Sequence, residues 1–347
     1  MTHDVLRFAI PSKGRIAEPV QAFLASCGLA VSRPNPRQYA ATIPTCLVVS
    51  VLFAHAEEIP GKVREGTVDV GMTGLDKLYE SGEEDDERAQ VIFSDLGIGR
   101  ARIVLGVPEG WIDAWSVADL ADLAVQYRDR GRDLRVSTDF PNITRSFLHR
   151  HGIHAFELLP TEGAVESAPS LGLADLVSTL LETGTSFREN HLKVLRGGTI
   201  LATETCCIAN LRTLRRHPEK LGPVKQLLEL FEARRRAQGF YSVVANIRGS
   251  SPDAVARHIW ERPTLAGIQG PTIARVYGPP GDPGDWYAAT LVVPTERLTE
   301  AVQHLRDSGG SGITAVPAAY VFESQSHSFT ALEEKIERGR PRGSAVG

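Results

Sequence analysis

Residues 163–187 read GAVESAPSLGLADLVSTLLETGTSF, and they contain the most informative turn in the chain. Near the end of this stretch, Glu182 is followed by Thr183, Gly184, Thr185 and Ser186. Consecutive backbone N–H groups in a turn of Gly, Thr and Ser form a concave site for an anion, and three hydroxyl groups add donors for phosphate oxygens. We therefore interpret residues 183–186 as a phosphate-binding loop, with a plain capped turn as the alternative.

Upstream of this turn, short apolar runs alternate with segments of helical spacing. The runs predict strands at residues 6–10, 47–52, 68–72, 103–107 and 134–137, and the spacing predicts helices at residues 16–27, 143–151 and 166–178. Strands separated by helices of this length are typical of a parallel or mixed α/β sheet with covering helices. We see no internal repeat.

Downstream of the turn, residues 221–238 predict a long charged amphipathic helix, and the composition changes after it. The order from there is strand, helix, strand, strand, helix, strand, at residues 241–247, 252–260, 272–277, 287–293, 296–306 and 313–321. This βαββαβ order is that of the ferredoxin-like motif, and residues 279–284 predict a hairpin turn between its middle strands. The polar residues 324–347 predict a mobile tail, in which residues 332–338 could form one or two helical turns.

A second candidate site is the turn that follows the first predicted strand, where open α/β sheets collect ligands. There Lys13 and Arg15 place two cations around Gly14, which suits an anionic ligand. A basic surface turn is the alternative.

A third candidate site is the segment DVGMTGLD at residues 69–76. Gly71 and Gly74 permit close approach of the backbone, and Asp69 and Asp76 could accept hydrogen bonds from a ligand. A tight strand-to-helix turn with Asp76 as its cap is the alternative.

Composition places the chain among soluble globular proteins. Its 347 residues are 42% hydrophobic and 23% charged, which is enough for a core and favours two or three domains. The net charge of −4 argues against a nucleic-acid binder, and the absence of a long apolar stretch argues against a membrane protein and favours the cytoplasm. We interpret the four cysteines (Cys27, Cys46, Cys206 and Cys207) as reduced core thiols, and the acidic residues 83–87 as a solvated loop or a frayed helix end.

Taken together, these segments resemble the ATP phosphoribosyltransferase family from about residue 6 to residue 323. Residues 10–15 resemble its Pro-x-Lys-Gly-Arg opening, and residues 69–76 resemble its Asp-x-Gly-x-Thr-Gly-x-Asp segment. Arg100 and Arg102 resemble its paired arginines, and residues 141–145 resemble its Pro-Asn-Leu-Thr-Arg run. The most specific match is the stretch quoted first. Residues 204–210 resemble the strand that returns to the family's first lobe, and residues 270–273 and 292–294 resemble the extra domain of its long form.

The resemblance implies an α/β fold with a two-lobed, periplasmic-binding-protein-like catalytic core and a C-terminal ferredoxin-like regulatory domain. Lobe I would comprise residues 1–100 and 197–236, lobe II residues 101–196 with the phosphate loop, and the regulatory domain residues 237–323. The implied reaction joins N1 of ATP to C1 of phosphoribosyl pyrophosphate and releases pyrophosphate, as the first step of histidine biosynthesis. Mg²⁺ as cofactor, feedback inhibition by histidine and a homo-oligomer between dimer and hexamer are also implied.

The resemblance also assigns the substrate-binding residues. They are Lys13, Gly14, Arg15, Asp69, Gly71, Thr73, Gly74, Arg100, Glu166, Asp175, Thr179, Glu182, Thr183, Gly184, Thr185 and Ser186. We expect residues 183–186 to bind the 5′-phosphate, Lys13 and Arg15 to face the pyrophosphate or the ATP phosphates, and Asp69 to lie near the adenine or ribose of ATP. The adenine nitrogen is already a nucleophile, so catalysis would come from positioning and charge stabilisation rather than from a strong base.

Four positions depart from the family's pattern. The family has Asp at Thr179, Ser or Gly at Glu182, Thr at Ser186 and Leu at Phe187. The carboxylate of Glu182 would repel a phosphate if it faces the loop, or replace the missing acid if it faces the ribose. These departures keep open a second hypothesis, a catalytically weak or silent paralogue that senses histidine or a nucleotide.

Overall fold

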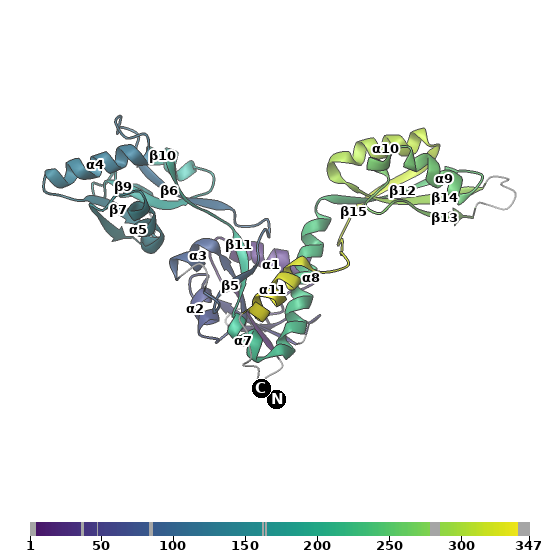
Figure 1. The fold of residues 1–347 in the computed structure, drawn as a ribbon, viewed down its shortest axis with the longest axis horizontal. Helices are drawn as coiled ribbons and strands as arrows, with labels where there is room; N and C mark the ends of the chain where they lie inside the picture. Colours follow the sequence, from purple (N-terminus) through teal and green to yellow (C-terminus); the bar gives the residue numbers. More distant parts are fainter. Residues whose placement is uncertain are drawn as a thin grey trace, which may run out of the picture. The chain divides into compact units, whose positions relative to one another are not determined.

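The computed structural model describes residues 5–35, 38–46, 48–82, 86–161, 163, 165–277 and 285–338. The chain divides into two compact units, one of the residues up to Lys225 together with those from Ser328 onward, and one of Gln226–His327. Each unit is described by itself below, and Figure 1 labels the elements. The division falls inside helix α8 (Leu221–Ala237), whereas the boundary expected from the sequence lies after residue 236.

Lobe I of the first unit is built on a six-stranded mixed sheet in the order β2-β3-β1-β4-β11-β5. Its strands are β1 (Leu6–Pro11), β2 (Ala40–Thr42), β3 (Val49–Ala54), β4 (Val70–Gly74), β5 (Gln90–Phe93) and β11 (Thr205–Ala209). Strand β1 is parallel to both β3 and β4, so the carboxyl ends of these three strands lie at one edge. The predicted mixed α/β sheet is confirmed, as is the return of the chain to this sheet through β11.

The helices of lobe I follow its strands. They are α1 (Ala17–Ser26), α2 (Ile59–Arg64), α3 (Leu75–Glu80) and α7 (Leu211–Arg216), with the 3-10 turn η2 (Pro218–Lys220). Helix α1 ends before Gly28, whose φ of +71° is unfavourable for any residue with a Cβ. Buried residues of α2 and α3 pack with those of β1 and β11 in one apolar cluster.

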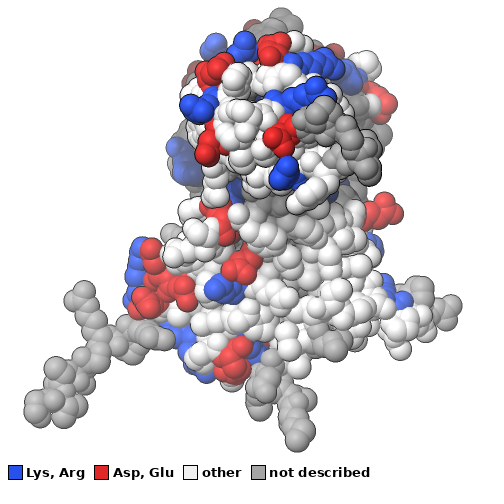
Figure 2. Space-filling model, turned by 90° about the vertical axis from the view of Figure 1, so that its right-hand side faces the viewer, with Lys and Arg blue, Asp and Glu red and all other residues white. Residues whose placement is uncertain are grey.

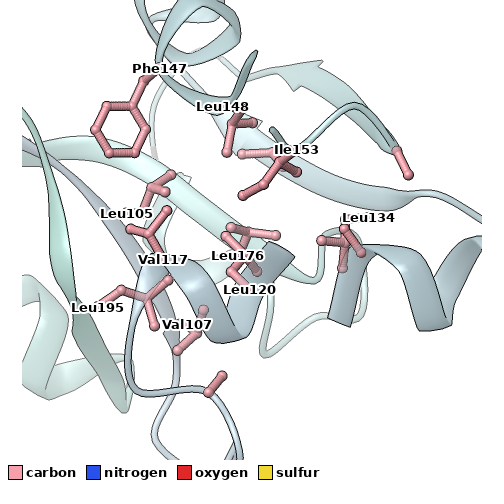
Figure 3. Close-up of a cluster of buried hydrophobic side chains, with 14 residues drawn as sticks. Leu105, Val107, Val117, Leu120, Leu134, Phe147, Leu148, Ile153, Leu176 and Leu195 are labelled. Atoms are coloured by element: carbon pink, nitrogen blue, oxygen red, sulfur yellow. The ribbon is translucent and has the colours of Figure 1, made fainter. Parts of the chain in front are cut away.

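Lobe II is built on a five-stranded sheet in the order β10-β6-β9-β7-β8. Its strands are β6 (Ala101–Pro108), β7 (Leu134–Thr138), β8 (Phe156–Pro160), β9 (Leu176–Leu181) and β10 (Leu192–Thr203). Its helical segments are α4 (Val117–Asp129), α5 (Pro141–Arg150), the 3-10 turn η1 (Val165–Ser167) and α6 (Thr185–Glu189). Figure 3 shows the apolar cluster in which α4 and α5 pack on the sheet, with Leu105 and Leu176 among its members.

The helix predicted at residues 166–178 is wrong. Only η1 is helical there, and residues 176–178 begin strand β9. Both faces of this strand are covered, because Leu176 packs in the cluster under α4 and α5 while Val177 packs with Phe187 of α6. A strand buried on both faces shows no alternation of apolar and polar residues, so its sequence is easily mistaken for that of a helix.

The second unit is a four-stranded antiparallel sheet in the order β13-β14-β12-β15. Its strands are β12 (Phe240–Arg248), β13 (Thr272–Val276), β14 (Trp286–Pro294) and β15 (Gly310–Pro317). Its helices are α9 (Pro252–Trp260) and α10 (Leu298–Asp307), with the 3-10 turns η3 (Pro263–Leu265) and η4 (Thr295–Arg297). The predicted ferredoxin-like βαββαβ order is confirmed. The hairpin turn expected at residues 279–284 lies outside the described residues.

The mobile tail expected at residues 324–347 is wrong for residues 327–331, and the helical turns allowed at residues 332–338 are confirmed, because both stretches form helix α11 (His327–Arg338). Phe329, Leu332 and Ile336 are buried on one face of this helix. The guanidinium of Arg215 donates a 3.0 Å hydrogen bond to the carbonyl oxygen of Ile336. These apolar residues recur at i, i+3 and i+7, so they lie on one face of the helix and can be buried there. The helix is therefore docked although the composition of the stretch is polar.

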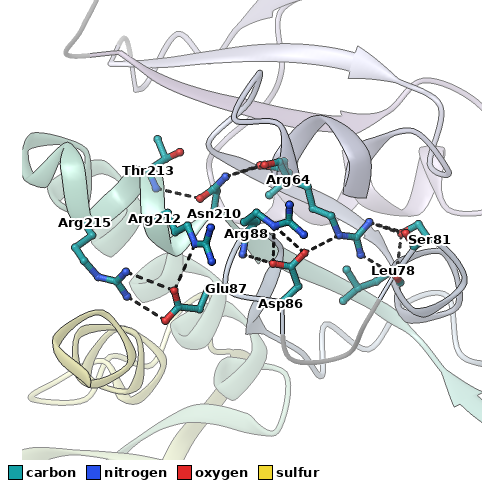
Figure 4. A network of polar contacts seen from close by, with 11 residues as sticks. Arg64, Leu78, Ser81, Asp86, Glu87, Arg88, Asn210, Arg212, Thr213 and Arg215 are labelled. Atoms are coloured by element: carbon teal, nitrogen blue, oxygen red, sulfur yellow. Dashed lines mark hydrogen bonds and ion pairs between the residues drawn. The ribbon is translucent and has the colours of Figure 1, made fainter. Parts of the chain in front are cut away.

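The acidic segment expected to be a solvated loop is held by cations where it is described. Asp86 pairs with Arg64 at 3.2 Å and with Arg88 at 2.9 Å, and Glu87 pairs with Arg215 at 3.4 Å (Figure 4). The hydrogen bond from Arg88 is the main reason that the pKa of Asp86 is lowered. This network ties the segment to α2 and α7. Residues 83–85 lie outside the described residues.

The surface and the cysteines agree with the composition. Acidic and basic side chains are interspersed on the face shown in Figure 2. None of the described helices is long and apolar enough to cross a bilayer. All four cysteines are buried thiols outside disulfide bonds, as predicted, and burial raises the pKa of the Cys206 and Cys207 thiols.

Candidate active site

A cavity of about 280 Å³ lies between lobes I and II at the carboxyl ends of their parallel strands. We call it the interlobe cavity. Three of its lining residues are cations, three are acids and four are apolar. The lining residues are Lys13, Gly14, Arg15, Ile16, Ala56, Glu57, Gly74, Asp76, Lys77, Asp139, Phe140 and Leu180.

The turn after β1 brings the first group of predicted residues to this cavity. Gly14 has a φ of +86°, which favours glycine there although a Cβ would meet no atom within 4 Å. The turn is closed by a hydrogen bond from the amide of Ala17 to the carbonyl oxygen of Gly14. Lys13 and Arg15 therefore lie directly before helix α1, where cations can meet an anionic ligand.

In the predicted segment at residues 69–76, some residues pack inside lobe I and others line the cavity. Of the substrate-binding residues assigned in it, only Gly74 lines the cavity, together with Asp76, which was expected as a possible acceptor for a ligand. A Cβ on Gly71 would lie 2.4 Å from Cγ2 of Ile59, so Gly71 allows α2 to pack closely on β4. The buried hydroxyl of Thr73 donates to the carbonyl oxygen of Ala56 at 2.8 Å and holds the loop after β3. Gly71 and Thr73, both expected to bind substrate, thus support the elements around the cavity without lining it.

Eight of the residues that line the cavity were not among the predicted substrate-binding residues, and four of these eight are Asp76, Lys77, Asp139 and Phe140. Asp76 is buried and accepts a 2.8 Å hydrogen bond from Thr203 Oγ1. Lys77 Nζ lies 4.6 Å from the ring centroid of Phe140, which is on the other lobe. Asp139 follows β7 as Arg15 follows β1. Applying the same strand-end rule to β7 would have found Asp139 and Phe140.

The loop at residues 183–186 connects β9 to α6 on the exposed surface of lobe II. Gly184 has a φ of +76° and directly precedes α6. The hydroxyls of Thr183 and Thr185 are 3.1 Å apart, and Ser186 Oγ donates to Glu166 at 3.1 Å. The structure thus brings Glu166 to the loop as expected. Because all three hydroxyls and a left-handed Gly meet in one turn, the arrangement can receive a phosphate group.

Phe187 and Thr179 explain how the loop is held. Phe187 packs so closely on Gly106 that a Cβ there would lie 2.5 Å from its ring. Thr179 is buried in β9, and the alternation of a strand puts it on the face of Val177 and Leu181. Leu180, on the opposite face, lines the cavity. The position where the family has Asp is therefore on the face that packs against η1 and α6.

The direction of Glu182 is settled by an ion pair. Arg15 Nη1 lies 2.9 Å from Glu182 Oε1, and the same nitrogen donates to the carbonyl oxygen of Gly99 at 3.0 Å. The side chain of Arg15 is 28% exposed and that of Glu182 is 48% exposed. This pair joins the turn after β1 in lobe I to the start of the phosphate loop in lobe II.

Arg100 lies at the crossing between the lobes and is not part of the cavity lining. Its guanidinium pairs with Asp95 at 2.6 Å and with Glu204 at 3.4 Å. Glu204 joins β10 to β11, and its carboxylate also accepts the amide of Asp95 at 2.7 Å. These contacts connect the two segments of the chain that cross between the lobes.

Asp69 and Asp175, both expected to bind substrate, are not among the residues that line the cavity. Both lie at the amino ends of strands, before β4 and β9, opposite to the cavity edge. Asp69 is fully buried and pairs with Arg7 at 2.7 Å and with Lys220 at 2.8 Å. Burial alone would raise the pKa of Asp69, but hydrogen bonds from Arg7 and Lys220 outweigh it and lower the pKa.

Asp175 repeats this arrangement in lobe II. Arg135 on β7 donates its amide and its guanidinium to Asp175, as Arg7 on β1 does to Asp69. Burial would raise the pKa of Asp175, but the hydrogen bonds from Arg135 lower it. We call each set an arginine–aspartate clasp. Its function is to join the amino ends of two parallel strands.

A second contact joins the lobes at the start of α5. The carboxylate of Glu80, the last residue of α3, accepts the amides of Asn142 and Ile143 at 2.8 and 3.0 Å. The residue before α5, Phe140, has no side-chain acceptor, so these amides receive their cap from the other lobe. The run at residues 141–145 therefore serves the interface between the lobes.

Comparison with known proteins gives two family matches. A family model described as ATP phosphoribosyltransferase matches residues 55–233, and one described as HisG, C-terminal domain matches residues 237–319. The first covers the cavity apart from the turn after β1, and the second covers the ferredoxin-like unit.

Individual relatives match most of the chain. ATP phosphoribosyltransferase 1 of Arabidopsis thaliana, a chloroplastic protein, is 35% identical over 93% of this chain and 79% of its own length. ATP phosphoribosyltransferase of Nitrobacter winogradskyi is 33% identical over 94% of this chain and 97% of its own. Among solved structures, the ATP phosphoribosyl transferase (HisG:HisZ) complex from Thermotoga maritima matches with a TM-score of 0.51 and 26% identity, over 66% of this chain and 99% of that chain.

Proposed function

The chain belongs to the ATP phosphoribosyltransferase family, and from that premise we propose that it joins N1 of ATP to C1 of phosphoribosyl pyrophosphate with release of pyrophosphate. We propose that this reaction is the first step of histidine biosynthesis, and the relatives named ATP phosphoribosyltransferase support this. The observation that carries the proposal in detail is the interlobe cavity, in which Lys13, Arg15 and Lys77 surround a space at the carboxyl ends of parallel strands.

The phosphate loop at residues 183–186 is the proposed site of the 5′-phosphate. Gly184 exposes backbone amides at the start of α6, and the three hydroxyls of the loop supply further donors. Glu166 holds Ser186 in place by accepting its hydroxyl proton in a hydrogen bond. This arrangement would fix the sugar, and hence C1, relative to the cavity.

Lys13, Arg15 and Lys77 are the proposed partners of the pyrophosphate and the ATP phosphates. The transition state of glycosyl transfer is like an oxocarbenium ion, and negative charge accumulates on the departing pyrophosphate. Cations already oriented around that position stabilise the leaving group without reorganisation. Because two polyanions must be held together, positioning accounts for much of the remaining acceleration.

Mg²⁺ is proposed as a component of the bound substrate rather than of a protein cage. Among the described residues, no three His, Cys, Asp or Glu side chains form a group that could hold a metal ion. The residues around the cavity fit a cation that is held mainly by pyrophosphate oxygens and water, as Mg²⁺ prefers. Bound in this way, it would neutralise charge on the leaving group.

The direct test uses purified protein with ATP, phosphoribosyl pyrophosphate and Mg²⁺. We expect release of pyrophosphate that depends on both substrates. No release from a folded sample, together with tight binding of histidine, would contradict the proposal and favour the second candidate. That candidate is a weak or silent paralogue that senses histidine or a nucleotide, and the Thr at position 179 is the observation that favours it.

Regulation and assembly are the remaining parts of the proposal. We propose that histidine inhibits the enzyme through the ferredoxin-like unit and that the chain forms a homo-oligomer between dimer and hexamer. The match of residues 237–319 to a C-terminal domain of the family supports the first point. An unchanged rate of pyrophosphate release at saturating histidine would contradict it. The cytoplasmic location stays a prediction, since the relatives include a chloroplastic protein.

A further inference from the structure

The carboxylate of Glu182 occupies the guanidinium of Arg15, one of the cations that surround the interlobe cavity. The two groups come from different lobes and are 2.9 Å apart. Glu182 directly precedes the first hydroxyl of the phosphate loop, so the pair lies where the cavity and the loop meet. A carboxylate at this place is a departure of this chain from its family, which has Ser or Gly there.

The geometry keeps Arg15 in place with or without Glu182. Arg15 Nη1 also donates to the carbonyl oxygen of Gly99, which belongs to the chain crossing between the lobes. Gly99 is closely packed by Thr205 and Ile16, since a Cβ on it would lie 2.5 Å from Thr205 Oγ1 and 2.9 Å from Ile16 Cγ2. Removal of the carboxylate would therefore leave an oriented cation beside the cavity.

We propose that Glu182 is a latch: it holds Arg15 in the unliganded protein, and an anionic substrate must displace it to reach this cation. The proposal rests on the function proposed above and identifies the residue that sets the affinity of that site for pyrophosphate groups. When only part of the protein has Arg15 available, the apparent dissociation constant equals the intrinsic constant divided by the available fraction. Since the pair is partly exposed, the effect on affinity is about two- to fivefold.

The rival roles of Glu182 predict different outcomes. If the Glu182 carboxylate binds the ribose of the substrate, in place of the acid missing at Thr179, its removal should weaken binding. If Glu182 is a latch, removal of its carboxylate should strengthen binding. The two are separated by the sign of the change in affinity.

The experiment measures binding of inorganic pyrophosphate by calorimetry to the wild type and to the Glu182→Gln variant, with KM for phosphoribosyl pyrophosphate measured in parallel. We expect the variant to bind pyrophosphate about two to five times more tightly and to show a lower KM. The difference should shrink in about 0.5 M salt, where charges are screened within a few ångströms. In the background of Arg15→Met, Glu182→Gln should lose most of its effect on pyrophosphate binding.

A matched control is Glu189→Gln, which removes the same charge from an exposed position at the end of α6. It should leave pyrophosphate binding nearly unchanged. Weaker binding by Glu182→Gln, equal binding, or no pyrophosphate binding by either form would each overturn the latch. Failure of the wild type to release pyrophosphate from its substrates would instead contradict the proposed reaction, and the binding measurement would still decide on the latch.

Discussion

At the scale of single residues, the arginine–aspartate clasp shows why charge alone did not identify a ligand site. Asp69 and Asp175 stand in Gly-x-x-Asp segments, and each accepts an amide and a guanidinium from an arginine on the neighbouring parallel strand. The same arginines bond the carbonyl oxygens of Gly66 and Gly172. This is an internal repeat of structure that the sequence did not reveal, because only a few residues of each copy take part.

The clasp in lobe II predicts a pH-dependent contribution to stability. Asp175→Asn should lower the free energy of unfolding at pH 7 by about 1–3 kcal/mol, since it removes a charged acceptor from a buried hydrogen-bonded group. The pKa of Asp175 is lowered by folding, so its contribution is present above the unfolded pKa of about 3.9 and is lost as the pH falls toward the folded pKa. Urea denaturation of both proteins between pH 7 and pH 3 would test this. A gap that stays constant over that range, or one as large in the exposed Asp129→Asn control, would contradict it.

Gly184 predicts a loss of function with little loss of fold. Gly184→Val would put a β-branched residue at a φ of +76° and distort the loop that is proposed to bind the 5′-phosphate. We expect pyrophosphate release to fall below detection while circular dichroism is unchanged. Gly131→Val is the matched control, because Gly131 has a φ of +81° and a Cβ there would meet no atom within 4 Å, while one on Gly184 would meet only Leu181 Cδ1, at 4.0 Å. Full turnover by the Gly184 variant would exclude the loop from the site.

At the scale of elements, the sequence was informative where one face of an element is exposed. The amphipathic spacing of α1 and α9 and the alternation in β12 predicted these elements closely. Strand β9 was missed because both of its faces are buried, and such a strand shows no alternation of apolar and polar residues. Likewise, Lys77 and Phe140 meet only because two lobes come together, and no local pattern encodes that meeting.

Helix α11 predicts a stability effect in the last part of the described chain. Leu332 is buried on its docked face, so Leu332→Ala should lower the free energy of unfolding by about 2–5 kcal/mol. Thermal unfolding followed by circular dichroism measures this change. The neighbouring Glu333→Ala variant changes an exposed residue and should have an effect below about 0.5 kcal/mol. Equal stability of Leu332→Ala and the wild type would show that α11 is not docked in solution.

At the scale of the whole molecule, the two lobes of the first unit are held by contacts that were invisible in the sequence. The Glu80 carboxylate caps α5 from the opposite lobe, and Arg15 reaches Glu182. The pattern of elements predicted an α/β sheet and the ferredoxin-like unit, and the division of the core into two lobes was implied by the resemblance to the family. The sequence could not predict these contacts, because a glutamate at the end of a helix is common on protein surfaces. Nothing in the sequence around α3 indicates that Glu80 contacts the other lobe.

The cap on α5 predicts local opening between the lobes. Glu80→Gln removes the charged acceptor of two helix amides, which is worth about 0.5–2 kcal/mol. Hydrogen exchange at Asn142 and Ile143 should therefore become about 2- to 30-fold faster, while the cores of both lobes keep their protection. Glu65→Gln, an exposed change at the end of α2, should leave this exchange unaltered. The interpretation fails if the Glu80 variant exchanges these amides at the wild-type rate.

The position of β11 within its sheet has a consequence for folding during synthesis on the ribosome. Strand β11 lies between β4 and β5, although it is made only after the whole of lobe II. The nascent chain can therefore complete the sheet of lobe II when Thr203 has emerged, while lobe I still lacks an interior strand. Lobe I begins first and finishes second. During that interval the edges of β4 and β5 are unpaired, and this is the stage of synthesis at which the chain most needs protection from aggregation.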